Sequence, residues 1–168
     1  MSIPAELELL FESFDRNARV NRAILSTLTM EDLLLGEEQG GFNVGQHLAD
    51  SVGFRPGWLS RVSPNHAASI PNVIDDDSPT WLGISSIAEL QAAFDAGDAA
   101  IKAAVLDAVN EGRSFEAAYR SHPAHFIQHC LVHDTHHRGQ VLTLLRQAGR
   151  PEELREKLSD ENWSVWRE

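Results

Sequence analysis

The sequence predicts an all-α protein, a four-helix bundle with short extra helices, built as one domain over residues 1–168. Four long segments carry apolar residues at helical spacing, and each is bounded by residues that start or stop helices. No segment alternates apolar and polar residues as a half-buried strand would. With 168 residues, 42% of them hydrophobic, the chain is long enough to bury a full core.

The first helix is expected from about Pro4 to Leu28, because proline suits a first helical turn and the apolar residues that follow keep a helical period. A short helical turn is expected next, over residues 30–35. Thr29 and Asp32 stand three residues apart at its start, as in a shortened capping box.

The second helix is expected from about Val44 to Val62, with Asn43 as the N-cap and Gln46 three residues later. Pro56 lies inside this pattern and predicts a kink or an irregular turn. Residues 63–85 then form a proline-containing loop that is long enough to cover a site.

The third helix is expected to begin at Ser85 or Ser86, where Ser86 and Glu89 form a capping box, and to end near Gly112. The fourth is expected from about Ser121 to Ala148, followed by glycine and proline as stop signals. Residues 151–168 predict one short helix and an irregular end.

Composition excludes several classes of function. The formal net charge of −11 argues against a nucleic-acid or anionic-membrane surface, since both need a basic field. The single cysteine rules out an intrachain disulfide framework. The acidic N-terminal segment is no signal peptide, and no apolar run approaches the roughly 20 residues of a membrane span. We therefore expect a cytoplasmic protein with no membrane partner.

The most informative stretch is a histidine-rich part of the fourth helix. His133 and His137 are four residues apart, which places both side chains on one face of a helix. That face also holds Phe126 and Leu144, so the two imidazoles lie on the apolar stripe. Buried imidazoles need partners, and a metal ion shared by both rings is one such partner. The alternative is a histidine-rich helix whose rings are satisfied by hydrogen bonds or solvent.

A third ligand is expected from another helix. His47 begins the second helix and is far in sequence from the pair, which suits a bundle site that bridges two helices. His66 lies in a polar segment, and His122 and His125 flank a helix start, where surface or capping roles are expected. A single cysteine argues against a thiolate-rich structural site, so an open three-histidine site is expected.

These residues carry a resemblance to a known family. The sequence His47-Leu48-Ala49-Asp50, followed by the spaced His129, His133 and His137 with Arg138-Gly139-Gln140, resembles the DinB/YfiT-like superfamily of metal-dependent enzymes. The resemblance covers about residues 5 to 150. It implies a four-helix bundle that holds a divalent metal on His47, His133 and His137.

The resemblance also implies the chemistry and the assembly. Zinc or nickel is the favoured cofactor, with iron, manganese or copper as alternatives. The implied activities are a thiol-dependent transferase, whose partner is a low-molecular-weight thiol, or a hydrolase acting on a small molecule. Members tend to be homodimers. The competing hypothesis is a non-catalytic metal-binding or stress-response module, and the sequence does not decide whether the protein is an enzyme.

Two further residues are candidates for catalytic roles. Asp50 lies one turn from His47 and could orient a ligand or act as a base, the alternative being a surface carboxylate. His129 lies one turn before His133 and could relay protons or be a packed, hydrogen-bonded ring. Asp134 stands where zinc proteases carry a catalytic glutamate, but the all-helical context argues against a protease. Arg138 is expected on the outer side, paired with an acidic residue.

Overall fold

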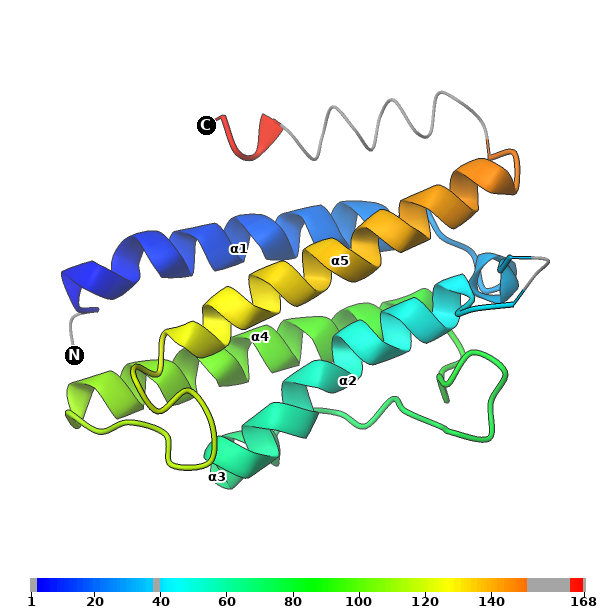
Figure 1. Ribbon diagram of the computed structural model, residues 1–168. Coiled ribbons are helices and arrows are strands. Elements are labelled where there is room, and N and C mark those ends of the chain that lie inside the picture. Colours follow the sequence, from blue (N-terminus) through cyan, green and yellow to red (C-terminus); the bar gives the residue numbers. More distant parts are fainter. Residues whose placement is uncertain (1–2, 38–39, 151–163, 168) are drawn as a thin grey trace.

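The computed structural model describes residues 3–37, 40–150 and 164–167 of the chain. Its four long helices are α1 (Ala5–Leu25), α2 (Val44–Val62), α4 (Ile87–Asn110) and α5 (His125–Gln147). The short 3-10 helix η1 (Glu31–Leu34) and the short helix α3 (Pro64–Ala67) lie between them in the sequence. The long helices run side by side in Figure 1. The all-α bundle with short extra helices is thus confirmed, and no strand occurs within the described ranges.

The second helix has the expected bounds and the expected start. The side chain of Asn43 accepts a hydrogen bond from the backbone N–H of Gln46 (2.8 Å), and the side chain of Gln46 accepts one from the backbone N–H of Asn43 (3.0 Å). This reciprocal pair is the predicted capping box. The helix continues through Pro56 without a break, so the expected irregular turn is absent from α2.

The other helices are shorter than predicted. Helix α1 ends at Leu25, because the backbone N–H groups of Thr27 and Leu28 turn back to carbonyls only three residues earlier. Helix α4 begins at Ile87, and its predicted cap is wrong in detail. The hydroxyl of Ser86 makes no cap to the helix backbone, while the Glu89 carboxylate accepts the backbone N–H of Ser85.

The last helix begins at His125 instead of Ser121. The preceding connection contains Tyr119 with φ 54°, a left-handed conformation that a helix cannot contain. The short turn before α2 holds as predicted, since Thr29 and Asp32 exchange hydrogen bonds. The helix expected in the C-terminal tail falls mainly on residues 151–163, which lie outside the described ranges.

The core consists of two apolar clusters with a layer of polar side chains between them. One cluster includes Leu48, Phe94 and Val141, and the other includes Phe14, Ile101 and Phe126. In each of α1, α4 and α5 a buried polar residue lies between the residues of one cluster and the residues of the other. We call the following residues the polar layer: Asn17, Ser51, Arg55, Asp98 and Asp134.

Candidate metal centre

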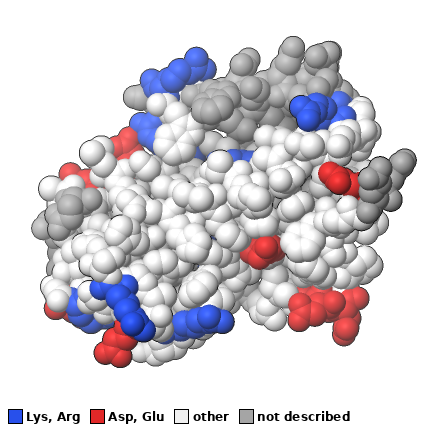
Figure 2. Space-filling view, in the orientation of Figure 1, with Lys and Arg blue, Asp and Glu red and all other residues white. Residues whose placement is uncertain are grey.

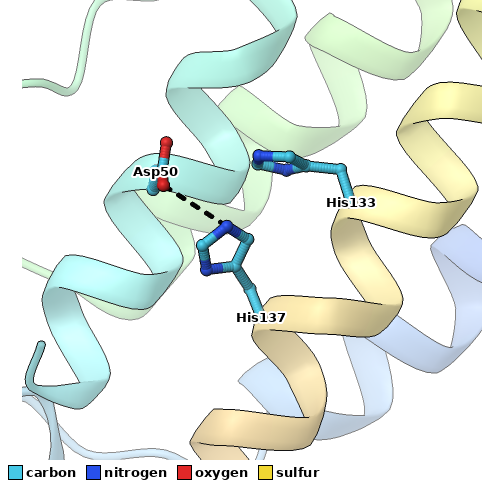
Figure 3. Close-up of side chains that lie close together, drawn as sticks. All are labelled: Asp50, His133 and His137. Atoms are coloured by element: carbon cyan, nitrogen blue, oxygen red, sulfur yellow. Dashed lines mark ion pairs between the residues drawn. The ribbon is translucent and has the colours of Figure 1, made fainter.

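Helices α2 and α5 together bring four side chains of metal-ligating type to one place. Helix α5 presents His133 and His137 one turn apart, and α2 presents His47 and Asp50 three residues apart. Figure 3 shows Asp50 on α2 pointing towards His133 and His137 on α5. The i,i+3 and i,i+4 spacings put each pair on one helix face, and packing of α2 against α5 turns the two faces towards each other.

His137 is the centre of this group. Its Nδ1 lies 3.1 Å from Nδ1 of His47, within hydrogen-bond distance. Its Nε2 lies 3.3 Å from Oδ2 of Asp50. One ligating atom from each of Asp50, His133 and His137 lies within 4.8 Å of the other two. Each ring nitrogen of His137 therefore faces a different side chain from α2.

Neighbouring aromatic rings hold the imidazoles in place. Phe54 packs on His133 with 4.2 Å between ring centroids, and Phe42 packs edge-on against His47 at 5.4 Å. Trp81 in turn packs edge-on against Phe42 at 4.7 Å. Through this contact the loop between α3 and α4 reaches the site, as its length suggested.

The donor set fits a divalent ion. Two ligands of a tetrahedral zinc ion at about 2.05 Å stand about 3.3 Å apart, close to the spacing of the His47 and His137 nitrogens. Nδ1 of His133 is buried and has no hydrogen-bond partner among the described residues. An unpartnered buried ring nitrogen is costly, and an ion or a donor in the cluster would relieve that cost.

Burial favours the neutral, ligating form of all three imidazoles. Desolvation is the largest effect on the pKa of His47, His133 and His137, and in each case the pKa lies below its ordinary value of 6.5. Repulsion from neighbouring imidazoles lowers the pKa values of His47 and His137 further, whereas Asp50 acts in the opposite direction. Neutral imidazole is the form that binds a metal.

The cluster lies at the base of an open pocket of about 500 Å³. Its lining includes the four side chains of metal-ligating type, His47, Asp50, His133 and His137. The rest of the lining consists of the apolar Phe42 and Val132 and two further imidazoles, His129 and His136. On the face drawn in Figure 2, Lys and Arg lie towards the margins and the central surface is largely uncharged. The pocket is therefore polar through its imidazoles and has room for a small molecule.

Asp134 does not take the place of a protease glutamate. It is 2% exposed and lies in the polar layer, where both of its oxygens pair with the guanidinium of Arg55 at 3.0 and 2.8 Å. Ser51 and the amide groups of Asn17 and Asn21 also donate to it. These donors and the cationic Arg55 hold the pKa of Asp134 well below its ordinary value despite burial.

The expected surface pairing of Arg138 is also wrong. Its Nη1 donates to the side-chain oxygens of Asn17 and Asn21 at 2.8 and 2.9 Å, so the partners are amides and the group is partly buried. The amides in turn donate to Asp134. Arg138 therefore joins the edge of the polar layer.

The remaining histidines lie where the sequence placed them, away from the cluster or at its rim. Ser63 and Asp107 contact the two ring nitrogens of His66, at 2.7 and 3.3 Å. His122 and His125 make local contacts at the start of α5. His136 and His129 both line the pocket and are exposed, and His129 lies one helical turn before His133.

Sequence reasoning missed Arg55, Phe42, Trp81 and Tyr119. Arg55 had a signal, because it occupies an apolar-flanked position in α2 while acidic residues occupy such positions in α4 and α5. The three aromatic residues had none, since their roles depend on how connecting segments fold.

The fold and the pocket together define a helical-bundle protein with a cluster of metal-ligating side chains between two helices. A model of the DinB family matches residues 1–168, and the chain belongs to this family. No significant match was found among curated proteins or among solved structures. No helix within the described residues has both the length and the apolar composition needed to cross a membrane.

Proposed function

We propose that the protein is a divalent-metal-dependent enzyme, either a thiol-dependent transferase or a hydrolase that acts on a small molecule. The observation that carries this proposal is the convergence of His47, Asp50, His133 and His137 at the base of an open pocket. A bound zinc or nickel ion would act there as a Lewis acid that activates a water or thiol nucleophile near neutral pH.

In this proposal His47, His133 and His137 hold the ion. All three are neutral near pH 7, and the two Nδ1 atoms of His47 and His137 have the spacing of ligands that share an ion. Asp50 faces Nε2 of His137 and orients this ring, as carboxylates commonly do behind metal-bound histidines. An alternative set replaces His47 with Asp50 and keeps the other two ligands.

The open pocket supports an enzyme over a non-catalytic metal-binding module. A purely structural site would be closed by a fourth protein ligand and would need no space beside it. Here the cluster faces a space that can admit a small molecule, with Phe42 and Val132 as apolar walls. His129 and His136 supply further groups that can donate or accept a proton beside the cluster.

Metal analysis of the purified protein tests this proposal. We expect about one equivalent of divalent metal, and we expect its loss in the His133→Ala/His137→Ala double variant. His66→Ala is the matched control, because His66 lies outside the pocket and should leave the metal content unchanged. A full equivalent in the double variant after dialysis would place the metal elsewhere.

Single variants in α2 separate the two ligand sets. His47→Ala should remove most of the metal, whereas Asp50→Ala should weaken binding by about 10- to 100-fold, as loss of an orienting group does. If Asp50→Ala abolishes stoichiometric binding and His47→Ala retains it, the carboxylate is the ligand. A screen of small thiols with electrophiles and of small hydrolysable esters then separates the transferase from the hydrolase.

We also propose a homodimer, which rests on the family resemblance. Light scattering at micromolar concentrations checks it, and a monomer mass across the range would contradict it.

A further inference from the structure

A second pair of polar side chains, Tyr119 and His129, lies at the pocket one helical turn before His133 of the candidate metal centre. The hydroxyl of Tyr119 lies 3.1 Å from Nδ1 of His129, and His129 lines the pocket. His129 is not among the ligands of the proposed function. Nε2 of His129 has no hydrogen-bond partner among the described residues, so one ring nitrogen is anchored and the other is free.

Two ring contacts hold Tyr119 in the segment that connects α4 and α5. Its ring stacks on the buried Phe126 with centroids 4.8 Å apart and planes 9° apart. Trp58 of α2 packs against it from another side, at 6.1 Å. The backbone adopts φ 54°, a conformation that is strained for a residue with a side chain. The fold thus maintains an unfavourable backbone geometry that delivers the hydroxyl to His129.

The orientation of His129 is fixed by two contacts. Phe54 packs edge-on against its ring, with centroids 4.7 Å apart and planes at 81°. The hydroxyl of Tyr119 fixes Nδ1. The proposal below requires the arrangement in which the phenol donates to Nδ1, because a phenol is a better donor than acceptor. The proton of neutral His129 then resides on Nε2, which becomes a hydrogen-bond donor.

The position of the Nε2–H group of His129 in the pocket indicates which ligands it can bind. The ring of His129 lies 6.3 Å from the ring of His133, along the same wall of the pocket. Among the described residues Asp50 is the only acidic one in the lining, so an ion on neutral imidazoles would make this part of the pocket net positive. A small anion with one atom at the ion and an oxygen about one helical turn, roughly 5–6 Å, away would meet both groups.

We propose that His129 binds a carboxylate oxygen of the substrate through Nε2–H, and that Tyr119 is a positioning residue that holds His129 in this orientation. The inference rests on the proposed function, because it assumes an ion at the neighbouring cluster. It specifies the substrate class as a small molecule that bears a carboxylate near the group that reaches the ion.

Two thiols of nearly equal shape test the proposal. 3-Mercaptopropionate and 1-propanethiol differ only in that a carboxylate replaces a methyl group, and thiolates bind soft or borderline divalent ions. Binding to the Co²⁺-loaded protein is followed by the visible absorption of the ion. We expect wild type to bind 3-mercaptopropionate about tenfold more tightly than 1-propanethiol, the effect of one hydrogen bond to a charged group.

The variants identify which residues cause that preference. His129→Ala and Tyr119→Phe should each reduce the preference several-fold, while the affinity for 1-propanethiol, the melting temperature and the cobalt content stay unchanged. His125→Ala is the matched control on the same helix, since its ring bonds to Gln128 outside the pocket. If both thiols bind and all variants keep the wild-type preference, the inference is overturned and the proposed function stands. If neither thiol binds the loaded protein, the inference and the thiol-transferase form of the proposed function are overturned together, and the hydrolase form stands.

A second readout needs no metal. A long-range ¹H–¹⁵N spectrum of the metal-free protein reports the tautomer of His129, whose signals are identified by their loss in His129→Ala. We expect the proton on Nε2 in wild type and a changed Nδ1 shift in Tyr119→Phe, which keeps the ring stack and removes only the hydroxyl. A proton on Nδ1 in wild type would overturn the inference.

Discussion

The proposed metal centre depends on imidazoles that stay uncharged. His47, His133 and His137 are half-buried or buried, and their crowding means that protonating one disfavours protonating the next. The same crowding that prepares them for an ion makes the metal-free site sensitive to acid.

The first prediction concerns the pH dependence of stability. In an unfolded chain these rings take up a proton near pH 6.5, whereas the folded protein binds it only at lower pH. Below pH 6.5 the unfolded state therefore binds more protons, and the free energy of unfolding falls as the pH falls. Asp98, whose pKa is raised to about 6, acts in the opposite direction in wild type and in the variant described next. Urea denaturation of the metal-free proteins from about pH 7.5 to about pH 5.5 should therefore show the histidine loss as a difference between the two.

The His133→Gln/His137→Gln double variant is the comparison, because glutamine is polar and does not titrate. Its stability should depend less on pH over the same range. An equal loss in wild type and in the double variant would assign the pH dependence to other groups.

At the residue scale, the sequence predicted the groups whose spacing alone constrains them. The i,i+4 rule puts His133 and His137 together without knowledge of the fold, and a bundle needs a ligand from a second helix, which pointed to His47. The sequence argued correctly against a protease role for Asp134 but did not predict its partner, because spacing says which residues share a face and not what that face meets. Its side chain points into the polar layer and to Arg55. Tyr119 could not be predicted, since its role depends on one backbone angle.

At the scale of elements, the polar layer sets how the helices fit together. The guanidinium of Arg55 in α2 is completely buried and pairs with Asp98 of α4 at 2.6 Å and with Asp134 of α5 at 2.8 Å. One cation thus serves two carboxylates. Burial, together with repulsion from Asp134, raises the pKa of Asp98 to about 6, although Arg55 opposes this shift. Ser51 and Asp134 adjoin Asp50 and His133 in sequence, so the polar layer and the candidate metal centre lie at the same level of α2 and α5.

The second prediction is that breaking this layer unfolds the protein more readily. Asp134→Ala leaves Arg55 with one carboxylate partner and should lower the free energy of unfolding by about 3–5 kcal/mol, as losing one member of a buried ion pair does. Asp15→Ala, which breaks the exposed pair with Lys102, should cost at most about 1 kcal/mol. Denaturant titration of both variants checks this, and similar losses would show that the layer contributes no more than a surface pair.

The third prediction concerns the glycine that makes room for Arg55. A Cβ atom at Gly97 would stand 2.6 Å from Cδ of Arg55, which is buried and cannot move aside, so Gly97→Ala should destabilise by about 1–3 kcal/mol. Gly57 is the matched control, since it also lies inside a helix and a Cβ there meets nothing within 4 Å. Gly57→Ala should be neutral or stabilising by up to about 1 kcal/mol. Equal effects at both glycines would contradict the close packing at Gly97.

At the scale of the whole molecule, the pattern of apolar residues was enough to predict the bundle. Four long amphipathic segments have few ways to bury their faces other than against one another, so the fold class followed from periodicity. Capping chemistry predicted the start of α2, where Asn43 and Gln46 form the capping box. It failed at the start of α5, because this helix begins after Ala124 and no side-chain hydrogen bond caps it.

The fourth prediction is that metal binding stabilises the whole bundle. The proposed ligands come from α2 and α5, which lie far apart in sequence, so an ion held by both opposes their separation on unfolding. Zn²⁺ at about 1,000 times its dissociation constant should add about 4 kcal/mol, or roughly 10 °C in melting temperature. The shift should vanish in His133→Ala/His137→Ala, and calorimetry with and without zinc measures it. A shift of the same size in the double variant would point to binding elsewhere.

The two non-glycine residues with positive φ in the described ranges bear on how this protein can be engineered. Trp81 (φ 57°) and Tyr119 (φ 54°) are both aromatic, and both lead to the pocket, through Phe42 and through His129. Glycine at either position would relieve about 1 kcal/mol of backbone strain but would remove a packed aromatic ring, which costs more. A directed-evolution library selected only for heat resistance would therefore tend to keep both aromatic residues. Thermostabilising glycine substitutions should be sought elsewhere on this scaffold, with Trp81 and Tyr119 held fixed.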